Sequence, residues 1–185
     1  MRRNEIALLL PEAYRDADEV KSPLDAILGA MEALHAPSER ILDDLDARID
    51  PRRATDDFMP YLSSWVDLDR YLDWSGAPGT SEPHYAAGLS RLRELIAAAS
   101  ELGKWRGTMS GLIGFLETAT GFSGFEIVEN PRGPLGGPPR QFHILVRAPA
   151  AARPISDLVQ RIVEEEKPAY LTFSLEFDTG DAPKS

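Results

Sequence analysis

Histidine and cysteine are the residue types that most often bind metals or attack substrates, and this chain holds three histidines and no cysteine. His35, His84 and His143 lie far apart in the sequence. No two of them have the i, i+4 spacing of a helical metal site. We therefore expect ordinary polar positions for all three, and predict no metal and no other cofactor. A small hydrolase that uses His84 or His143 is the enzymatic alternative.

Acidic residues cluster at two places, and neither cluster has the pattern of a catalytic or metal site. The first cluster comprises Asp43, Asp44, Asp46 and Asp50. It lacks the glycine and the terminal glutamate of a calcium-binding loop, so we interpret it as a solvated or partner-facing acidic surface. The second cluster, Glu164–Glu166, ends a predicted helix, where negative charge opposes the helix dipole. A cation must compensate it, either Lys167 or a group on another chain.

The glycine-rich stretch 107–114 does not have the pattern of a phosphate-binding loop. It lacks the Gly-Lys-Ser/Thr ending and does not follow a predicted strand. Gly111 and Gly114 instead favour close approach of two helices. Arg106 could bind a carboxylate of a neighbouring element or cap the carbonyls of the preceding helix. No serine has the setting of a nucleophile elbow, so the sequence predicts a protein that is not an enzyme.

Composition and charge exclude several binding functions. The 185 residues carry a net charge of −10, and 43% of them are hydrophobic. Residues 1–50 hold 12 acids and 6 bases, whereas residues 51–185 hold 18 and 14. Without clustered bases, binding to nucleic acid or to an anionic membrane is not expected. Apolar runs are far shorter than the roughly 20 residues of a membrane span, and no signal peptide is recognisable, so we expect a cytoplasmic protein.

The elements that would position any site begin with a long helix after a charged lead-in, residues 1–22. Ser22 is a good N-cap, Pro23 fits the first helical position, and the helical pattern extends from residue 24 to residue 49. Its heptad seam consists of Leu24, Leu28, Met31, His35, Ser38, Leu42, Leu45 and Ile49. Ile27, Leu34 and Ile41 widen this seam on one side. Pro37 is expected to kink or break the helix.

The seam has two interpretations. It is either the core of an amphipathic hairpin that packs on its own domain, or a helix that docks into a bundle of several chains. In the second case the partner interface comprises Leu24, Leu28, Met31, Leu42, Leu45 and Ile49.

Shorter helices follow, and then the pattern changes to strands. We predict helices from residue 55 or 56 to Trp65, from Ser81 to Trp105, and from Thr108, an N-cap, to a stop at Gly121. Residues 125–129, 141–147 and 171–177 alternate as strands, and a helix opens at Pro154 and ends before Pro168. The Pro/Gly-rich stretch 129–140 is predicted to be a loop between two strands.

The sequence therefore predicts an α+β fold, in which an N-terminal helical part precedes a small β-β-α-β module. The expected division is a lead-in at 1–22, a helical domain at 23–121, the β-β-α-β domain at 122–178 and a disordered tail at 179–185. A module of about 55 residues is marginal alone, because so small a domain buries only about 60% of its unfolded surface. Packing against the helical part or against another chain would stabilise it.

Four segments in this order resemble the tail protein I-like baseplate family of contractile phage tails and related injection systems. Residues 9–16 are similar to its Leu-Pro-x-x-Tyr-x-x-Asp opening, and residues 50–68 to its Asp-Pro…Trp-Leu-Gly-Leu block. Residues 105–121 are similar to Arg-Gly-Thr…Gly-Leu…Thr-Gly, and residues 166–172 to Glu-Lys-Pro-Ala-His-Thr. The structural motif residues are Trp65, Arg106, Gly107, Thr108, Gly121, Lys167 and Pro168. Val66-Asp67 and Tyr170-Leu171 depart from the family pattern.

This resemblance implies a structural baseplate wedge subunit of a phage tail, a tailocin or a cellular injection system. Such a subunit links the central spike and tube to the sheath-proximal baseplate, and it rearranges on triggering. The implied partners are a larger wedge protein bound through a helical bundle, other copies of the wedge in a six-fold baseplate, and spike, hub, tube or sheath-proximal proteins. The family supplies no catalytic residues. The alternative is a soluble adaptor or assembly chaperone for tail components.

Overall fold

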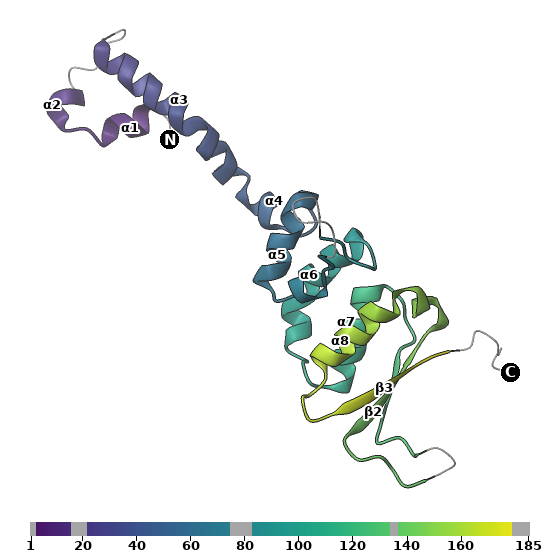
Figure 1. Cartoon of the computed structure of the whole chain (residues 1–185). Helices are drawn as coiled ribbons and strands as arrows, with labels where there is room; N and C mark the ends of the chain where they lie inside the picture. Colours follow the sequence, from purple (N-terminus) through teal and green to yellow (C-terminus); the bar gives the residue numbers. More distant parts are fainter. Residues whose placement is uncertain (1–2, 16–21, 75–82, 134–136, 179–185) are drawn as a thin grey trace. The chain divides into compact units, whose positions relative to one another are not determined.

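The computed structural model describes residues 3–15, 22–74, 83–133 and 137–178 (Figure 1). Within these ranges the chain forms eight α-helices and one three-stranded sheet. The predicted α+β fold, with helices first and a small β module after them, is confirmed. Contacts divide the chain into an N-terminal unit, Met1–Ile49, and a C-terminal unit, Asp50–Ser185. The predicted tail, residues 179–185, lies outside the described residues.

Helix α3 is the main element of the N-terminal unit. It extends over Pro23–Asp43, and the shorter helices α1 (Arg3–Leu8), α2 (Glu12–Arg15) and α4 (Leu45–Ile49) flank it in sequence. Its start is as predicted, because the Ser22 side chain accepts a hydrogen bond from the Asp25 amide at 3.0 Å and Pro23 occupies the first turn. The helix continues through Pro37, and the interruption before α4 falls at Asp44 instead.

The C-terminal unit begins with helices. The 3₁₀ turn η1 (Asp56–Phe58) leads into α5 (Met59–Trp65), and η2 (Asp69–Tyr71) follows. Helix α6 extends over Leu89–Gly103, so the predicted start at Ser81 is wrong: residues 83–88 are not helical. The physical reason is that His84 pairs with Asp73 in an isolated β-bridge, which holds its backbone in an extended conformation.

A tight corner joins α6 to α7 (Met109–Thr120), and the sequence predicts it well. The Thr108 hydroxyl accepts a hydrogen bond from the Gly111 amide at 3.0 Å. A Cβ atom at Gly111 would clash with the backbone carbonyl oxygen of Trp105, so the corner closes only around glycine there. Gly121 ends α7 with a φ of 75°, the left-handed conformation predicted for this position.

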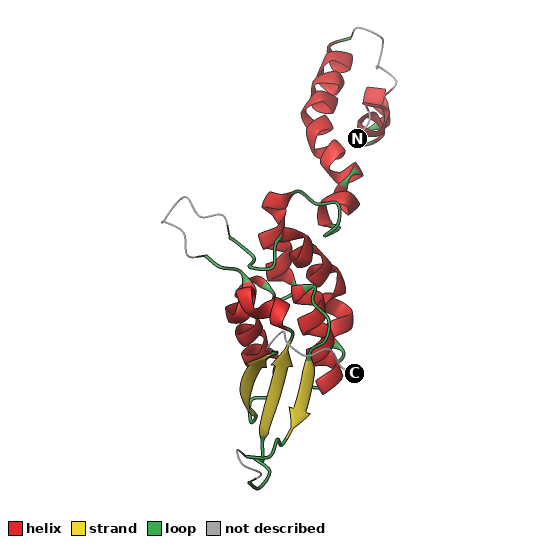
Figure 2. Cartoon of the chain, turned by 90° about the vertical axis from the view of Figure 1, so that its right-hand side faces the viewer, coloured by secondary structure: helices red, strands yellow, loops and turns green. Residues whose placement is uncertain are grey.

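Three strands and a crossover helix complete the unit (Figure 2). The sheet order is β1 (Glu126–Glu129), β2 (His143–Ala148), β3 (Thr172–Phe177). Strand β1 is antiparallel to β2, and β2 is parallel to β3 through the turn η4 (Ala150–Ile155) and helix α8 (Ser156–Glu166). Strand β2 is buried along most of its length: Val146 is fully buried, and Arg147 is the one exposed residue of the strand.

One hydrophobic core connects the helices and the sheet of the C-terminal unit. Leu95 of α6, Leu116 of α7, Val146 of β2 and Ile162 of α8 all belong to it, and none is solvent-exposed. The small module thus packs against helices of its own chain, one of the two solutions expected for a marginal module. The division into domains at 23–121 and 122–178 stays a prediction.

Candidate partner interface

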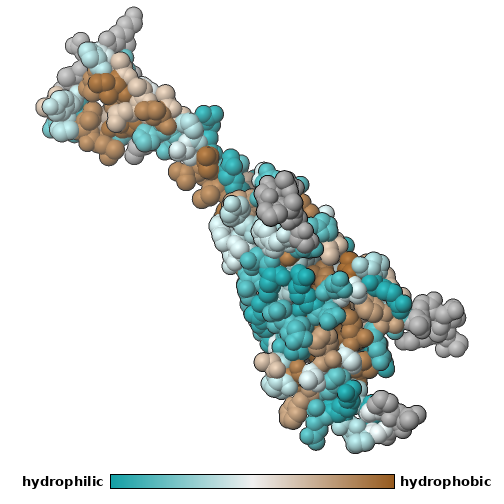
Figure 3. All heavy atoms as spheres, in the orientation of Figure 1, coloured by the Kyte–Doolittle hydropathy of each residue, from teal (hydrophilic) through white to brown (hydrophobic). Residues whose placement is uncertain are grey.

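Helix α3 exposes a row of large apolar side chains. Leu34 is 77% exposed, and Ile27 and Ile41 are 58% and 48% exposed. Figure 3 shows such apolar residues, in brown, at the surface of the part that contains α1 and α3. Contiguous exposed apolar surface is typical of a protein–protein interface. Burying one Leu or Ile side chain contributes about 1.5–3 kcal/mol, so a partner that covered several of these residues would bind tightly.

The predicted interface residues divide into buried and exposed positions. Leu28 is 1% exposed, and Leu24 is partly buried. The exposed ones are Met31, Leu42, Leu45 and Ile49. Helix α1 packs against α3 and carries Ile6, the second buried apolar residue of the described N-terminal unit. Leu28 therefore contributes to the packing of this unit.

Near Leu28 the exposed apolar surface of α3 is rotated relative to the predicted seam, whereas Leu42 of that seam is itself exposed. The side chains of the rotated surface follow the 4-3 spacing of a heptad row, one position away from Leu28, and all are exposed. We call this set the α3 apolar row: Ile27, Met31, Leu34 and Ile41 of α3, together with Leu45 at the start of α4. The row includes Ile27, Leu34 and Ile41. In the sequence analysis these residues only widen the predicted seam. The contact with α1 determines which of the two rows is buried. The periodicity of the sequence alone does not reveal this contact.

Two of the predicted motif blocks meet at a buried carboxylate in the C-terminal unit. Glu166, at the end of α8, is 9% exposed. Its Oε1 accepts hydrogen bonds from Arg70 and from the Tyr71 hydroxyl, both at 2.8 Å. Arg106 binds both carboxylate oxygens, with Nη2 at 3.2 Å from Oε1 and Nε at 3.1 Å from Oε2. The carboxylate that Arg106 could bind is therefore Glu166 of its own chain.

The negative charge at the end of α8 is thus compensated by cationic side chains of the same chain. Arg70 and Arg106 neutralise Glu166, whereas Lys167 pairs with Glu164 at 3.1 Å. The cations for Glu166 come from residues 96 and 60 positions away in sequence. This Glu166 cluster, defined as Arg70, Tyr71, Arg106 and Glu166, fixes the end of α8, just before Pro168, to η2 and to the α6–α7 corner. Its role is to hold elements in place.

Burial makes two tyrosines of this unit resistant to ionisation. The pKa of Tyr71 is raised by burial, by its hydrogen bond to Glu166 and by the charge of that carboxylate. Burial also raises the pKa of Tyr85, whose hydroxyl donates to the Ala119 carbonyl at 3.0 Å. Both hydroxyls are neutral donors in the folded chain.

We expect the C-terminal unit to lose stability in alkali. Because the folded pKa of each tyrosine lies above the unfolded value of about 10, its contribution is complete below pH 10 and declines as the pH rises above it. The measurement is the melting temperature between pH 8 and 11.5. Tyr85→Phe should reduce the alkaline decline, whereas the exposed Tyr61→Phe should leave it unchanged. Equal declines in all three chains would contradict the assignment.

Trp65 lies at the surface, although the sequence places it in a motif block. The side chain is 65% exposed, and Tyr61 on the same helix is 63% exposed. Phe58 connects them: its ring stacks with that of Tyr61, with 5.7 Å between the ring centroids, and meets that of Trp65 edge-on, with 6.0 Å between the centroids.

Gly107, with a φ of 79°, and Thr108 belong to the α6–α7 corner, so they shape the fold.

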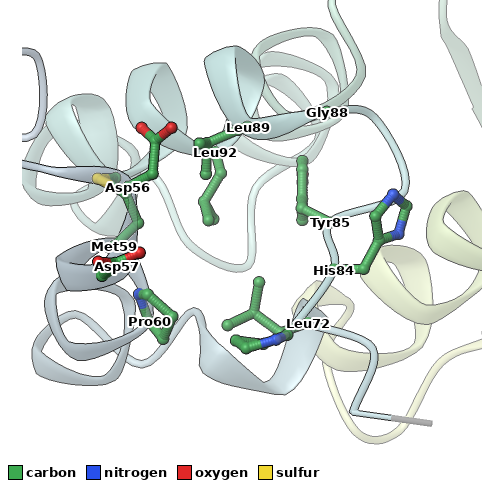
Figure 4. A pocket seen from close by; sticks show the side chains of 11 residues that line it. Asp56, Asp57, Met59, Pro60, Leu72, His84, Tyr85, Gly88, Leu89 and Leu92 are labelled. Carbon is green, nitrogen blue, oxygen red and sulfur yellow. The ribbon is translucent and has the colours of Figure 1, made fainter. Parts of the chain in front are cut away.

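The three histidines do not come together. His35 is exposed on α3, and His84 lies on the rim of a hollow of about 400 Å³ (Figure 4). His143 is buried, with Nδ1 at 2.8 Å from the Thr172 hydroxyl and Nε2 at 3.1 Å from that of Ser174. It thus bridges β2 and β3 through hydroxyl groups. Among the described residues, no group of three or more His, Cys, Asp or Glu could hold a metal ion.

Comparison with known families decides what kind of protein this is. The model of the phage tail protein family (Tail_P2_I) matches residues 16–170, which include α3, the four residues of the Glu166 cluster and the strands β1 and β2, and end just before β3. The chain belongs to this phage tail protein family. A comparison with curated proteins returned no match. The described helices of this phage tail protein include none that is long and apolar enough to cross a bilayer.

Membership in the family gives the coarse function. A phage tail protein has a structural role in a tail particle and associates with other tail components. The resemblance recognised from the sequence motifs is therefore confirmed.

Proposed function

We propose that the chain is a baseplate wedge subunit of a contractile tail or injection system. In this role it links the central spike and tube to the sheath-proximal baseplate. The observation that supports this most is the α3 apolar row, because four large side chains of α3, and Leu45 at the start of α4, are exposed at heptad spacing. Such a row fits a multi-helix bundle with a second, larger wedge protein.

The C-terminal unit would supply further contacts of the wedge. It holds its own core and carries separate exposed aromatic residues, Tyr61 and Trp65, so it does not depend on the α3 row for its fold. Within a six-fold baseplate these surfaces would face other wedge copies, spike or hub, tube or sheath-proximal proteins. Triggering would then rearrange a set of interfaces that has two stable states. The subunit would assemble in the cytoplasm and remain in the particle.

Quantitative mass spectrometry of purified particles tests the proposal. A structural wedge subunit should be present in fixed proportion to the sheath and tube proteins, and should remain after stringent washing. If the chain is needed for assembly but absent from finished particles, it is the alternative, a soluble adaptor or assembly chaperone. If the chain is also missing from particles that lack the larger wedge protein, this result would support the proposed helical bundle between the two proteins.

A further inference from the structure

A hollow in the C-terminal unit has an apolar floor. It lies between the segment formed by η1 and α5, residues 83–88 and the start of α6 (Figure 4). Its floor is formed by side chains that are at most 4% exposed: Met59, Leu72, Tyr85 and Leu92. Leu89 lines it and is 37% exposed. At about 400 Å³, the hollow has room for one long side chain or a small ring.

The rim of the hollow carries one uncompensated negative charge. Asp56 and Asp57 lie on the side opposite His84 (Figure 4). Asp56 forms an ion pair with Arg93, which also donates to the Pro51 carbonyl. Among the described residues, Asp57 has neither an ion-pair partner nor a side-chain hydrogen bond. A carboxylate beside an apolar floor matches a cation on an apolar stem.

We propose that this hollow receives an arginine or lysine side chain from a segment of another tail protein. The methylenes of that side chain would lie on Leu72 and Leu92, and its charged end would pair with Asp57. Asp57 precedes Tyr61 by four residues, so the same segment could continue over the exposed rings of Tyr61 and Trp65. Aromatic side chains of this kind often carry much of the energy of an interface.

The net charge of the chain decides whether a second copy or a different protein occupies the hollow. A second copy of this chain brings a net charge of −10, so two copies repel each other. A basic segment is attracted by the same charge, and this favours a different protein. The inference goes beyond the wedge proposal, since it concerns the C-terminal unit and uses no residue of α3.

Three small probes of one shape and different charge test the chemistry of the hollow. We would titrate the ¹⁵N-labelled full chain with benzamidine, benzyl alcohol and benzoate at pH 8, to 20 mM each. Benzamidine should shift the amide signals of Asp57, Gly88 and Leu89, and should bind about three- to fivefold more tightly than benzyl alcohol. Benzoate should bind more weakly than either. Equal binding of the three probes, or no shift at these amides, would overturn the proposal.

Matched variants locate the site. Asp57→Asn should reduce the affinity for benzamidine to that for benzyl alcohol. Leu89→Arg should abolish binding, because it places a cation and its stem in the hollow, whereas Ser90→Arg should bind normally. Ser90 is exposed in the same helical turn and does not line the hollow. If Ser90→Arg and Leu89→Arg behave alike, the hollow is not the binding site.

A photo-crosslink identifies the occupant. Benzoyl-phenylalanine at Leu89 in purified particles should crosslink to a peptide of another tail protein that contains Arg or Lys, and Asp57→Lys should reduce the yield at least fivefold. A crosslink to a second copy, to an acidic peptide, or to none would overturn the proposal. The wedge proposal has its own test in the protein content of the particles, so the two can fail separately.

Discussion

Replacing Leu34 and Ile41 together by aspartate is expected to prevent incorporation of the chain into particles while leaving it folded. The two side chains are 77% and 48% exposed, so the free chain loses little packing. In a bundle, two apolar contacts would be lost, about 3–6 kcal/mol in total, and two carboxylates would be buried without partners. Affinity should fall at least a hundredfold. The measurement is the amount of chain in purified particles, relative to sheath protein.

A matched control separates this effect from added charge. Ala26→Asp with Ala33→Asp introduces two carboxylates at the same spacing of seven residues, also at exposed positions of α3 but outside the apolar row. We expect normal incorporation of this control. Leu28→Asp is unsuitable as a test, because Leu28 is 1% exposed and its replacement would disrupt the unit itself. Normal incorporation of the Leu34/Ile41 variant would show that the α3 row binds nothing.

Glu166→Ala is expected to destabilise the C-terminal unit by about 2–4 kcal/mol. The substitution leaves Arg70 and the Tyr71 hydroxyl without their acceptor in a largely buried site, and removing one partner of a buried ion pair is strongly destabilising. The estimate is below the full value for a buried pair because the Arg106 side chain is 49% exposed. The melting temperature should fall by about 4–16 °C.

Two neighbouring substitutions test the assignment of this effect. Glu165→Ala, at an exposed position of the same helix, should change the free energy of unfolding by less than about 0.5 kcal/mol. Arg106→Ala should cost less than Glu166→Ala, since its side chain is about half exposed and Arg70 still compensates the carboxylate. Similar melting temperatures for the Glu165 and Glu166 variants would contradict the Glu166 cluster.

Local features of the fold were predictable from the sequence because they depend on few neighbouring residues. Ser22 and Thr108 cap their helices through the amide three residues later, and the left-handed turn at Gly121 needs only the absence of a Cβ atom. The sequence predicts the strands β2 and β3 within two residues, because apolar side chains at every second position are typical of strands.

Features set by distant contacts could not be predicted in this way. The start of α6 moves from Ser81 to Leu89 because His84 pairs with Asp73, and this is a tertiary contact. The partners of Glu166 lie 60 and 96 residues away, so the sequence showed the unfavourable charge without the arginines that compensate it. The orientation of the α3 row depends likewise on α1, which buries the Leu28 side.

Cysteine labelling of the α3 row tests most directly whether another protein covers it. The chain has no cysteine, so Leu34→Cys provides one thiol in the row, and Gly29→Cys provides one where added side-chain atoms meet open space. Both thiols should react rapidly with maleimide in the free chain. In purified particles, the proposal predicts that the thiol at 34 is protected at least tenfold more than the thiol at 29. Equally rapid labelling of both thiols in the particle would contradict it.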